Sequence, residues 1–294
     1  MNTRILAADF EYLVPQTIQE SIEMLDRYGP DAKPLAGGTD LLVQIKKEVI
    51  SPRYLIDLGK IPDMRFIRVD DGWLTIGGAT KWSEILTFCA RDRKYDALSD
   101  AVSLLAKVQV RNMGTIGGNL CTASPAADSA PPLLVFDSRV KLDGPKGERR
   151  VELEEFFVGV NQTVMAPNEI MTEVQIPPVE DKTGSAFAKT TRVGADISKI
   201  SCAVSVKRQG DTCTACRIAM GAAAPVPLRV KASRIIEGKK IEPSVVEEVA
   251  HHAAGEIKPI DDIRSTAPYR EAMSTVLVRD VFWKAWHRAD GGTS

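Results

Sequence analysis

The sequence predicts an α+β protein of two domains, and three observations support this prediction. Segments with strand-like alternation and segments with helical periodicity follow one another along all 294 residues, a length sufficient for more than one domain. A pair of prolines and a charged stretch, Pro177 to Lys182, come after a buried strand and mark a boundary between residues 1–177 and 178–294. Beyond this boundary, three alternating segments indicate a three-stranded antiparallel sheet accompanied by helices.

The composition is that of an ordinary globular protein, with 44% hydrophobic and 26% charged residues. Lys and Arg number 38 against 39 Asp and Glu, so the net charge of -1 argues against nucleic-acid or membrane-surface binding. We expect no membrane span, because no apolar run reaches the required length, and no signal peptide at the N-terminus. Five cysteines without disulfide-like density fit a reducing cytoplasm.

Residues 1–58 are expected to form a first subdomain. Thr17 to Glu20 is a capping box that begins a helix, and Gly29-Pro30 ends it. Residues 33–36 then read as a short strand, followed by a glycine turn and a helix capped by Thr39 or Asp40. A second buried strand is expected over 54–58.

The second subdomain, residues 59–177, is predicted to contain two hairpins and three helices. The hairpins join 64–69 to 73–77 and 140–142 to 149–151, the helices span 83–89, 97–106 and 130–136, and a strand covers 169–176. In the C-terminal domain, strands are expected over 185–189, 200–208 and 212–220, and helices over 228–238, 244–255 and 268–287. The stripe from Val276 to Trp286 in the last helix suits internal packing or a subunit interface.

Two glycine-rich stretches carry the strongest functional signal. The stretch from Arg111 to Asp128 holds three glycines in five positions, Gly114, Gly117 and Gly118, among small hydroxyl and amide side chains. Without Cβ atoms, such a chain lets a ligand approach its backbone N–H groups, which favour a phosphate. A similar stretch, Ala36 to Leu42, lies between a strand and a helix. We therefore predict that two glycine turns close on one diphosphate, with purely structural turns as the alternative; neither turn matches a Rossmann or Walker pattern.

Longer motifs around these turns resemble the FAD-binding subunits of the molybdenum hydroxylases, the xanthine dehydrogenase family. They are A-G-G-T-D-L-L (36–42), I-G-G-A-T (76–80), Q-V-R-N-M-G-T-I-G-G-N-L (109–120), T-A-S-P-A-A-D (122–128) and G-A-A-A-P-V-P-L-R (221–229). The resemblance covers nearly the whole chain. It implies a p-cresol methylhydroxylase/vanillyl-alcohol-oxidase-type FAD-binding domain of two subdomains, followed by the C-terminal domain of the flavin subunit.

The resemblance also implies which residues hold FAD. The diphosphate would lie on the two glycine turns, and single contacts would come from an acid, a hydroxyl and two apolar side chains. Lys189 is a further candidate, although the run after it is one residue shorter than in the family, so an exposed lysine at a strand end is the alternative. The implied cofactor-binding residues are Pro34, Leu35, Ala36, Gly37, Gly38, Thr39, Asp40, Leu41, Leu105, Thr115, Ile116, Gly117, Gly118, Asn119, Thr122, Asp128, Met171 and Lys189.

No metal site is expected in this chain. Cys213 and Cys216 form a lone C-x-x-C without a nearby histidine, and residues three apart on a regular strand point to opposite faces. The three histidines lie in predicted C-terminal helices, where the adjacent pair His251-His252 diverges around the helix. No catalytic acid or base is expected either.

The function implied by the resemblance is electron transfer. A large partner would hold the molybdenum cofactor and oxidise the substrate, a small partner would hold two [2Fe–2S] clusters, and this chain would pass electrons through FAD to NAD⁺ or another acceptor. A dimer of heterotrimers is expected, and the match around Ala195 to Ala203 favours a purine or other N-heteroaromatic substrate. The alternatives are a stand-alone flavin oxidase of the same fold and a non-catalytic assembly subunit without flavin.

Overall fold

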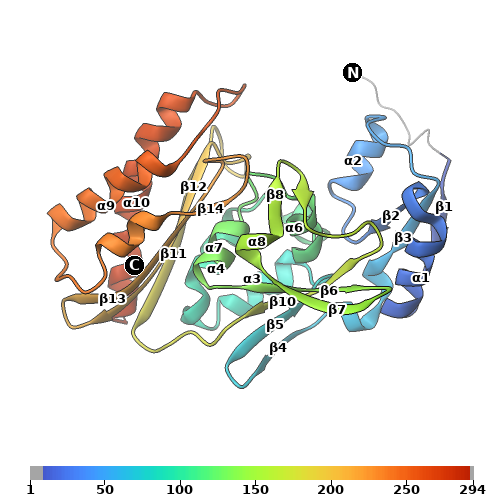
Figure 1. Ribbon diagram of the computed structural model, residues 1–294, viewed down its shortest axis with the longest axis horizontal. Coiled ribbons are helices and arrows are strands. Elements are labelled where there is room, and N and C mark those ends of the chain that lie inside the picture. The colour runs from blue at the N-terminus through green and yellow to red at the C-terminus, as the bar shows by residue number, and fades with distance from the viewer. Residues whose placement is uncertain (1–8, 292–294) are drawn as a thin grey trace.

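In the computed structural model, which describes residues 9–291, three main sheets follow one another along the chain (Figure 1). In the view of Figure 1 the N-terminal sheet lies on the right, a five-stranded sheet in the middle and the C-terminal sheet on the left. Between residues 9 and 291, no helix combines the length and the hydropathy that a membrane span requires. The N-terminal residues 1–8, on which part of the signal-peptide expectation depends, lie outside the described residues.

The N-terminal subdomain is a parallel sheet of three short strands with a helix packed on each face, α1 (Ile18–Tyr28) on one and the short α2 (Leu41–Lys46) on the other. The strands are ordered β1 (Glu11–Leu13), β3 (Tyr54–Asp57) and β2 (Ala32–Leu35). Helix α1 begins as predicted, since the Thr17 hydroxyl accepts a hydrogen bond from the Glu20 amide at 3.1 Å. The Glu20 carboxylate, however, accepts from the Gln16 amide at 2.6 Å, one residue before the cap.

The middle subdomain contains an antiparallel sheet with helices packed against it. Its strands are ordered β4 (Ile67–Asp70), β5 (Trp73–Gly77), β10 (Ile170–Ile176), β6 (Arg139–Gly144) and β7 (Gly147–Glu152), and both predicted hairpins are confirmed. Helices α3 (Trp82–Cys89), α4 (Asp96–Leu104) and α7 (Ala130–Val135) share one buried apolar core with the sheet. A short helix and a two-stranded ribbon, α8 (Leu153–Phe156), β8 (Phe157–Gly159) and β9 (Gln162–Thr163), complete this part.

The second glycine-rich stretch differs from the predicted turn, because a short helix lies within it and another ends where it begins. Helix α5 (Val108–Arg111) is followed by α6 (Ile116–Thr122), whose first turn contains Gly117 and Gly118. The Thr115 hydroxyl caps α6 by accepting a hydrogen bond from the Gly118 amide at 3.1 Å. This capping bond offsets the poor helix propensity of two successive glycines.

The C-terminal domain has a four-stranded antiparallel sheet, so the predicted three strands were incomplete. The order is β11 (Thr183–Thr190), β12 (Ile200–Gln209), β13 (Thr212–Gly221) and β14 (Leu228–Arg229). The predicted helix over 228–238 is wrong: residues 228–229 pair with β13, and Lys231–Ile235 forms a short 3₁₀ helix. The free edge of β13 offers these residues backbone partners, including the bond from the Val230 amide to the Ile218 carbonyl at 3.0 Å.

Two long helices, α9 (Pro243–Glu256) and α10 (Ala267–Ala289), lie against this C-terminal sheet (Figure 1). The apolar stripe of α10 packs inside the domain, where Val278, Phe282 and Trp286 are buried. Its last turn also ties the two domains together. Asp100 on α4 accepts hydrogen bonds from Arg288 at 2.7 Å and from the Phe187 amide at 3.1 Å.

The expectation that Cys213 and Cys216 point to opposite faces is wrong. The register between β12 and β13 shifts at Lys207 and Arg208, so that Thr214 is an extra, bulged residue. The bulge places both thiols on the same face, in the core of the C-terminal domain. The hydrogen bond with Cys213, together with burial, raises the pKa of the Cys216 thiol well above its ordinary value.

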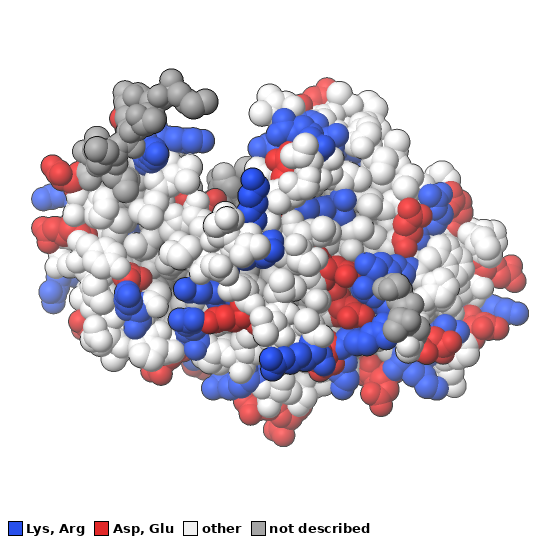
Figure 2. Space-filling view, turned by 180° about the vertical axis from the view of Figure 1, so that it is seen from behind, with Lys and Arg blue, Asp and Glu red and all other residues white. Residues whose placement is uncertain are grey.

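The surface seen from behind carries positive and negative side chains side by side, with no extended field of one sign (Figure 2). The upper edge of the molecule is notched between the N-terminal subdomain and the rest of the chain in this view.

Candidate functional site

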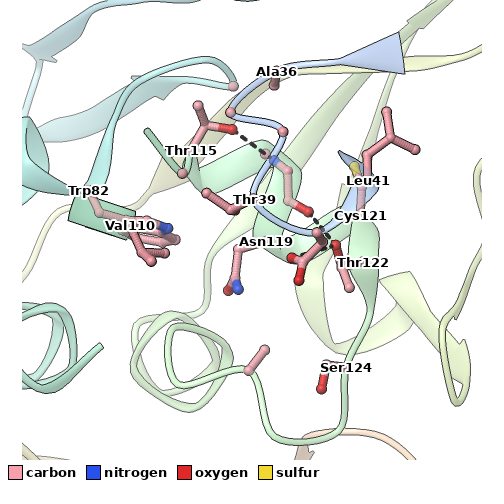
Figure 3. Close-up of a pocket in the computed structure, with 18 of the residues that line it drawn as sticks. Ala36, Thr39, Leu41, Trp82, Val110, Thr115, Asn119, Cys121, Thr122 and Ser124 are labelled. Atoms are coloured by element: carbon pink, nitrogen blue, oxygen red, sulfur yellow. Dashed lines mark hydrogen bonds between the residues drawn. The ribbon is translucent and has the colours of Figure 1, made fainter. Parts of the chain in front are cut away.

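A cavity of about 530 Å³ lies between the N-terminal and middle subdomains (Figure 3). This volume is in the range of small-molecule and cofactor sites. The first glycine turn forms one wall, and α6 with the loop behind it forms the facing wall. All but three of the residues predicted to bind the cofactor line this cavity: Pro34, Ala36, Gly37, Gly38, Thr39, Asp40, Leu41, Leu105, Thr115, Gly117, Gly118, Asn119, Thr122, Asp128 and Met171.

Leu35, Ile116 and Lys189 do not line the cavity. The Leu35 side chain belongs to the small core beneath α2 (Leu41–Lys46), because successive residues of β2 point to opposite faces. The Ile116 side chain is fully buried in the core of the middle subdomain. Lys189 lies behind the cavity wall with 3% of its side chain exposed, which also excludes the exposed strand-end lysine.

The two glycine stretches meet by close backbone packing. A Cβ atom on Gly37 would lie 2.2 Å from the Met113 carbonyl oxygen, and one on Gly117 would lie 2.6 Å from the Gly78 carbonyl oxygen. Both glycines are therefore required by packing. A Cβ atom on Gly118 would meet only the Thr115 hydroxyl, at 3.0 Å, and Gly118 itself lines the cavity. The space in front of Gly118 is thus open to a ligand.

The two stretches differ in the hydrogen-bond donors that they offer. In α6, the amides of Ile116 and Gly117 donate to the Thr80 and Gly78 carbonyls at 3.1 and 2.9 Å, so they are already satisfied. The expectation that the second turn supplies a run of free amides is therefore wrong. In the first turn, by contrast, residues 37–40 lie in the described part of the chain and their amides donate to no protein acceptor there. These amides suit an anion.

Polar side chains add donors to the same space. Asn119 accepts a hydrogen bond from the Ser129 hydroxyl at 2.6 Å through its amide oxygen, which leaves its NH₂ group as a donor. The Thr122 hydroxyl lies 2.9 Å from the Gly118 carbonyl, to which it donates, and 3.4 Å from the Asp40 carboxylate. Figure 3 shows Thr39 and Asn119 facing the space between the two walls.

A buried ion pair closes the wall at Asp128. Its carboxylate accepts hydrogen bonds from the Lys189 ammonium at 2.6 Å and from the Ser198 hydroxyl. Burial raises the pKa of the Asp128 carboxyl, and Lys189 and Ser198 oppose this shift. Lys189 also donates to the Asp196 carbonyl at 3.0 Å, and Asp196 lines the cavity. Lys189 therefore affects the cavity indirectly, because its hydrogen bonds hold the Asp128 carboxylate and the Asp196 carbonyl in place.

Sequence reasoning missed about half of the lining, because most of these residues come from segments outside the two glycine stretches. They include Gly78, Trp82, Val110, Cys121, Met165 and Glu169. Gly78 lies within the I-G-G-A-T motif, which was the only available signal for it. The Cys121 sulfur lies 3.5 Å from the Met165 sulfur.

This arrangement fits a flavin dinucleotide, since the first glycine turn offers open amides and the second stretch offers both a glycine that permits close approach and a hydrogen-bonded carboxylate. Residues 8–179 match the family described as the FAD binding domain in molybdopterin dehydrogenase. Residues 185–285 match the CO dehydrogenase flavoprotein C-terminal domain. The cavity thus defines an FAD-binding flavoprotein.

Individual relatives agree with this assignment. The carbon monoxide dehydrogenase medium chain of Hydrogenophaga pseudoflava is 34% identical over 280 residues, covering 95% of this chain and 98% of the relative. The xanthine dehydrogenase FAD-binding subunit of Escherichia coli O157:H7 is 30% identical and covers 94% and 95% of the two chains. The chain belongs to the FAD-binding subunits of the molybdenum hydroxylase family.

Solved structures of this family have the same fold. A carbon monoxide dehydrogenase chain from Hydrogenophaga pseudoflava superposes with a TM-score of 0.92 at 33% identity, covering 95% of this chain and 98% of that one. Quinoline 2-oxidoreductase from Pseudomonas putida 86 gives a TM-score of 0.89 at 26% identity, with 95% and 98% covered. The protein is therefore an oxidoreductase subunit that carries FAD.

Proposed function

We propose that this chain transfers electrons between two partners of a molybdenum hydroxylase complex. It would take electrons from the [2Fe–2S] clusters of a small partner subunit and pass them to NAD⁺ or another acceptor. A large partner with the molybdenum cofactor would oxidise the substrate. The observation that carries this proposal is the cavity between the two glycine stretches, which is shaped for FAD and contains no nucleophile with an adjacent base among its described lining residues.

We assign the diphosphate to the first glycine turn and the space in front of Gly118. The backbone amides of residues 37–40 and the Thr39 hydroxyl would donate to the diphosphate. Helix α6 would let the diphosphate approach its backbone at Gly118, and the side-chain NH₂ group of Asn119 would donate a further hydrogen bond. Asp128 would accept from a hydroxyl of the cofactor, held in place by Lys189. Leu105 and Met171 would supply apolar contacts, and Thr122 would lie near the isoalloxazine ring.

The chemistry of the transfer belongs to the cofactor, since a bound flavin accepts electrons singly and releases a hydride. This chain's residues would hold the ring, exclude water from its buried side and leave one side open. No side-chain acid or base takes part in this proposal.

We further propose a purine or another N-heteroaromatic compound as the substrate of the large partner. Two sequence features support this substrate class. They are the T-D pair at Thr39-Asp40 and the run A-D-I-S-K-I-S-C-A that begins at Ala195. The relatives include subunits of xanthine dehydrogenase and nicotinate dehydrogenase as well as of carbon monoxide dehydrogenase. Assaying the intact complex with xanthine, nicotinate and carbon monoxide tests this choice, and turnover of carbon monoxide alone would contradict it.

The assembly expected for this function is a dimer of heterotrimers in the cytoplasm, and all five cysteines are free. We divide the chain into an FAD-binding domain, residues 1–177 with subdomains of about 1–58 and 59–177, and a C-terminal domain, residues 178–294. Limited proteolysis tests the division, since the first cuts should fall close to Pro177-Pro178.

The direct test is to purify the complex, record its absorption spectrum, denature it and identify the released cofactor. Released FAD together with iron–sulfur absorbance is the expected result. A colourless chain that still binds both partners would instead favour an assembly subunit. Oxidation of an organic substrate by this chain alone would favour a stand-alone flavin oxidase.

A further inference from the structure

One segment forms both a wall of the cavity and an exposed surface of the molecule. Within residues 104–113, Leu105 and Val110 line the cavity, and Figure 3 shows Val110 beside Trp82 at its edge. Leu104, Val108 and Met113 do not line the cavity, yet they are 43%, 57% and 53% exposed. We call these three side chains, with Lys107, the outer wall surface.

The shape of this segment is fixed by its own hydrogen bonds. The Arg111 guanidinium donates to the carbonyls of Leu105 and Ala106, both at 2.8 Å, and so ties α5 to the end of α4. Ala106 has a positive φ of 44°, which an alanine adopts only when its surroundings hold it there. The outer wall surface is therefore presented by a constrained backbone, which lowers the entropic cost of binding a partner.

Exposed apolar side chains are concentrated in this segment. It contains four large exposed hydrophobic residues, counting Val110, and no other ten-residue stretch between residues 9 and 291 contains more than three. Single exposed apolar residues are ordinary, but a cluster marks an interaction surface. The stretch with three, residues 260–269, belongs to the C-terminal domain and contributes no side chain to the cavity.

The charge of this region indicates the character of the partner. Between Asp100 and Asp128 the sequence contains two basic residues, Lys107 and Arg111, and no acidic one. Lys107 is exposed next to Val108. An apolar surface with a positive edge complements a partner surface that is apolar with acidic residues around it.

We propose that the outer wall surface docks the small iron–sulfur subunit, an inference that rests on the proposed function. Electron transfer slows steeply with distance, so the donor must approach the flavin closely. A partner seated on Leu104, Val108 and Met113 is separated from the cavity by this single segment, of which Leu105, Ala106 and Val110 line the cavity. Val193 and Ile197 are also exposed on a segment that lines the cavity, but they are two exposed apolar residues against the four of residues 104–113.

The test compares two variants in the co-expressed complex. Val108→Glu places a carboxylate in the surface, and Val158→Glu is the matched control, because Val158 is also 57% exposed and lies outside both the segment and the cavity lining. For Val108→Glu we expect the affinity for the iron–sulfur subunit to fall at least about tenfold, with unchanged FAD content. Val158→Glu should match the wild type. Lys107→Glu should weaken association most at low ionic strength.

Three results would overturn the proposal. One is a Val108→Glu complex that forms and reduces its flavin at the wild-type rate. Another is loss of the large subunit, or of self-association, with the iron–sulfur subunit still bound, which would assign the surface to a different occupant. The third is a wild-type complex without FAD or without iron–sulfur clusters, which would refute the proposed function itself and the docking inference with it.

Discussion

Replacing Gly118 by leucine tests the placement of the cofactor, because this substitution should affect the ligand and leave the fold intact. The added Cβ meets only the Thr115 hydroxyl at 3.0 Å, and the rest of the side chain enters the cavity. Leucine at a helical position is about 1 kcal/mol more favourable than glycine. The contact with Thr115 opposes this gain, so the apoprotein should be close to wild type in stability.

The loss of FAD affinity can be estimated from the bonds that the diphosphate would lose. A hydrogen bond to a charged group contributes about 1.5–3 kcal/mol. Displacing the diphosphate from two such donors costs ~3–6 kcal/mol, or roughly 10²- to 10⁴-fold in affinity. The Gly118→Leu protein should therefore be purified without flavin.

The assay measures FAD released per chain after denaturation, together with thermal unfolding of the flavin-free protein. Gly255→Leu is the matched control, since Gly255 lies in α9 and a Cβ added there would have no heavy atom within 4 Å. Gly37→Ala should instead lower the thermal stability of the flavin-free protein, because the added Cβ would lie 2.2 Å from the Met113 carbonyl oxygen and must disturb the fold. Wild-type FAD content in Gly118→Leu would show that the cofactor has been placed wrongly.

Three further predictions concern buried and paired groups. Asp128→Asn should destabilise the FAD-free chain by ~3–5 kcal/mol, because it leaves the Lys189 ammonium buried without its counter-ion. The double variant Asp128→Asn/Lys189→Met should recover most of the lost free energy of unfolding, as measured in urea. A destabilisation by Asp128→Asn of less than ~1 kcal/mol would contradict the account. The hydrogen bond from Arg149 lowers the pKa of Glu169, so the pair stabilises the fold above the ordinary glutamate pKa and less as pH falls through the lowered value. The stability difference between wild type and Arg149→Gln, ~0.5–1 kcal/mol near neutrality, should therefore shrink in acid, and a difference that grows would be inconsistent with this sign. Burial raises the pKa of the Cys202 thiol, so iodoacetamide should modify it only after unfolding; rapid labelling of the folded chain, detected by mass spectrometry, would argue against this burial.

The sequence allowed prediction of elements that are determined by local patterns. The Thr17 cap, the two hairpins and the long C-terminal helices depend on capping, turn residues and periodicity, and the structure confirms them. The short strand β14 could not be found in this way, because residues 228–229 become a strand only when the edge of β13 is beside them. The bulge at Thr214, which reverses the expected direction of Cys213, is likewise a property of strand pairing.

The candidate site was predictable where glycines mark it. Both glycine stretches do converge on one cavity, but their amides have different roles, since those of Ile116 and Gly117 are consumed by carbonyls 36 and 39 residues away in sequence, at Thr80 and Gly78. That difference depends on tertiary pairing and leaves no mark in the sequence. Lys189 illustrates the same limit: its partner Asp128 is 61 residues away, and only the fold shows that it acts behind the cavity wall.

The central claim is that this chain passes electrons from an iron–sulfur partner to an external acceptor. The most direct measurement is rapid mixing of the purified complex with the substrate of its molybdenum subunit, in the absence of an acceptor, while iron–sulfur and flavin absorbance are followed separately. The account predicts that both absorbances bleach, and that adding the acceptor restores them at the rate of turnover. Clusters that become reduced beside a flavin that stays oxidised would contradict the account.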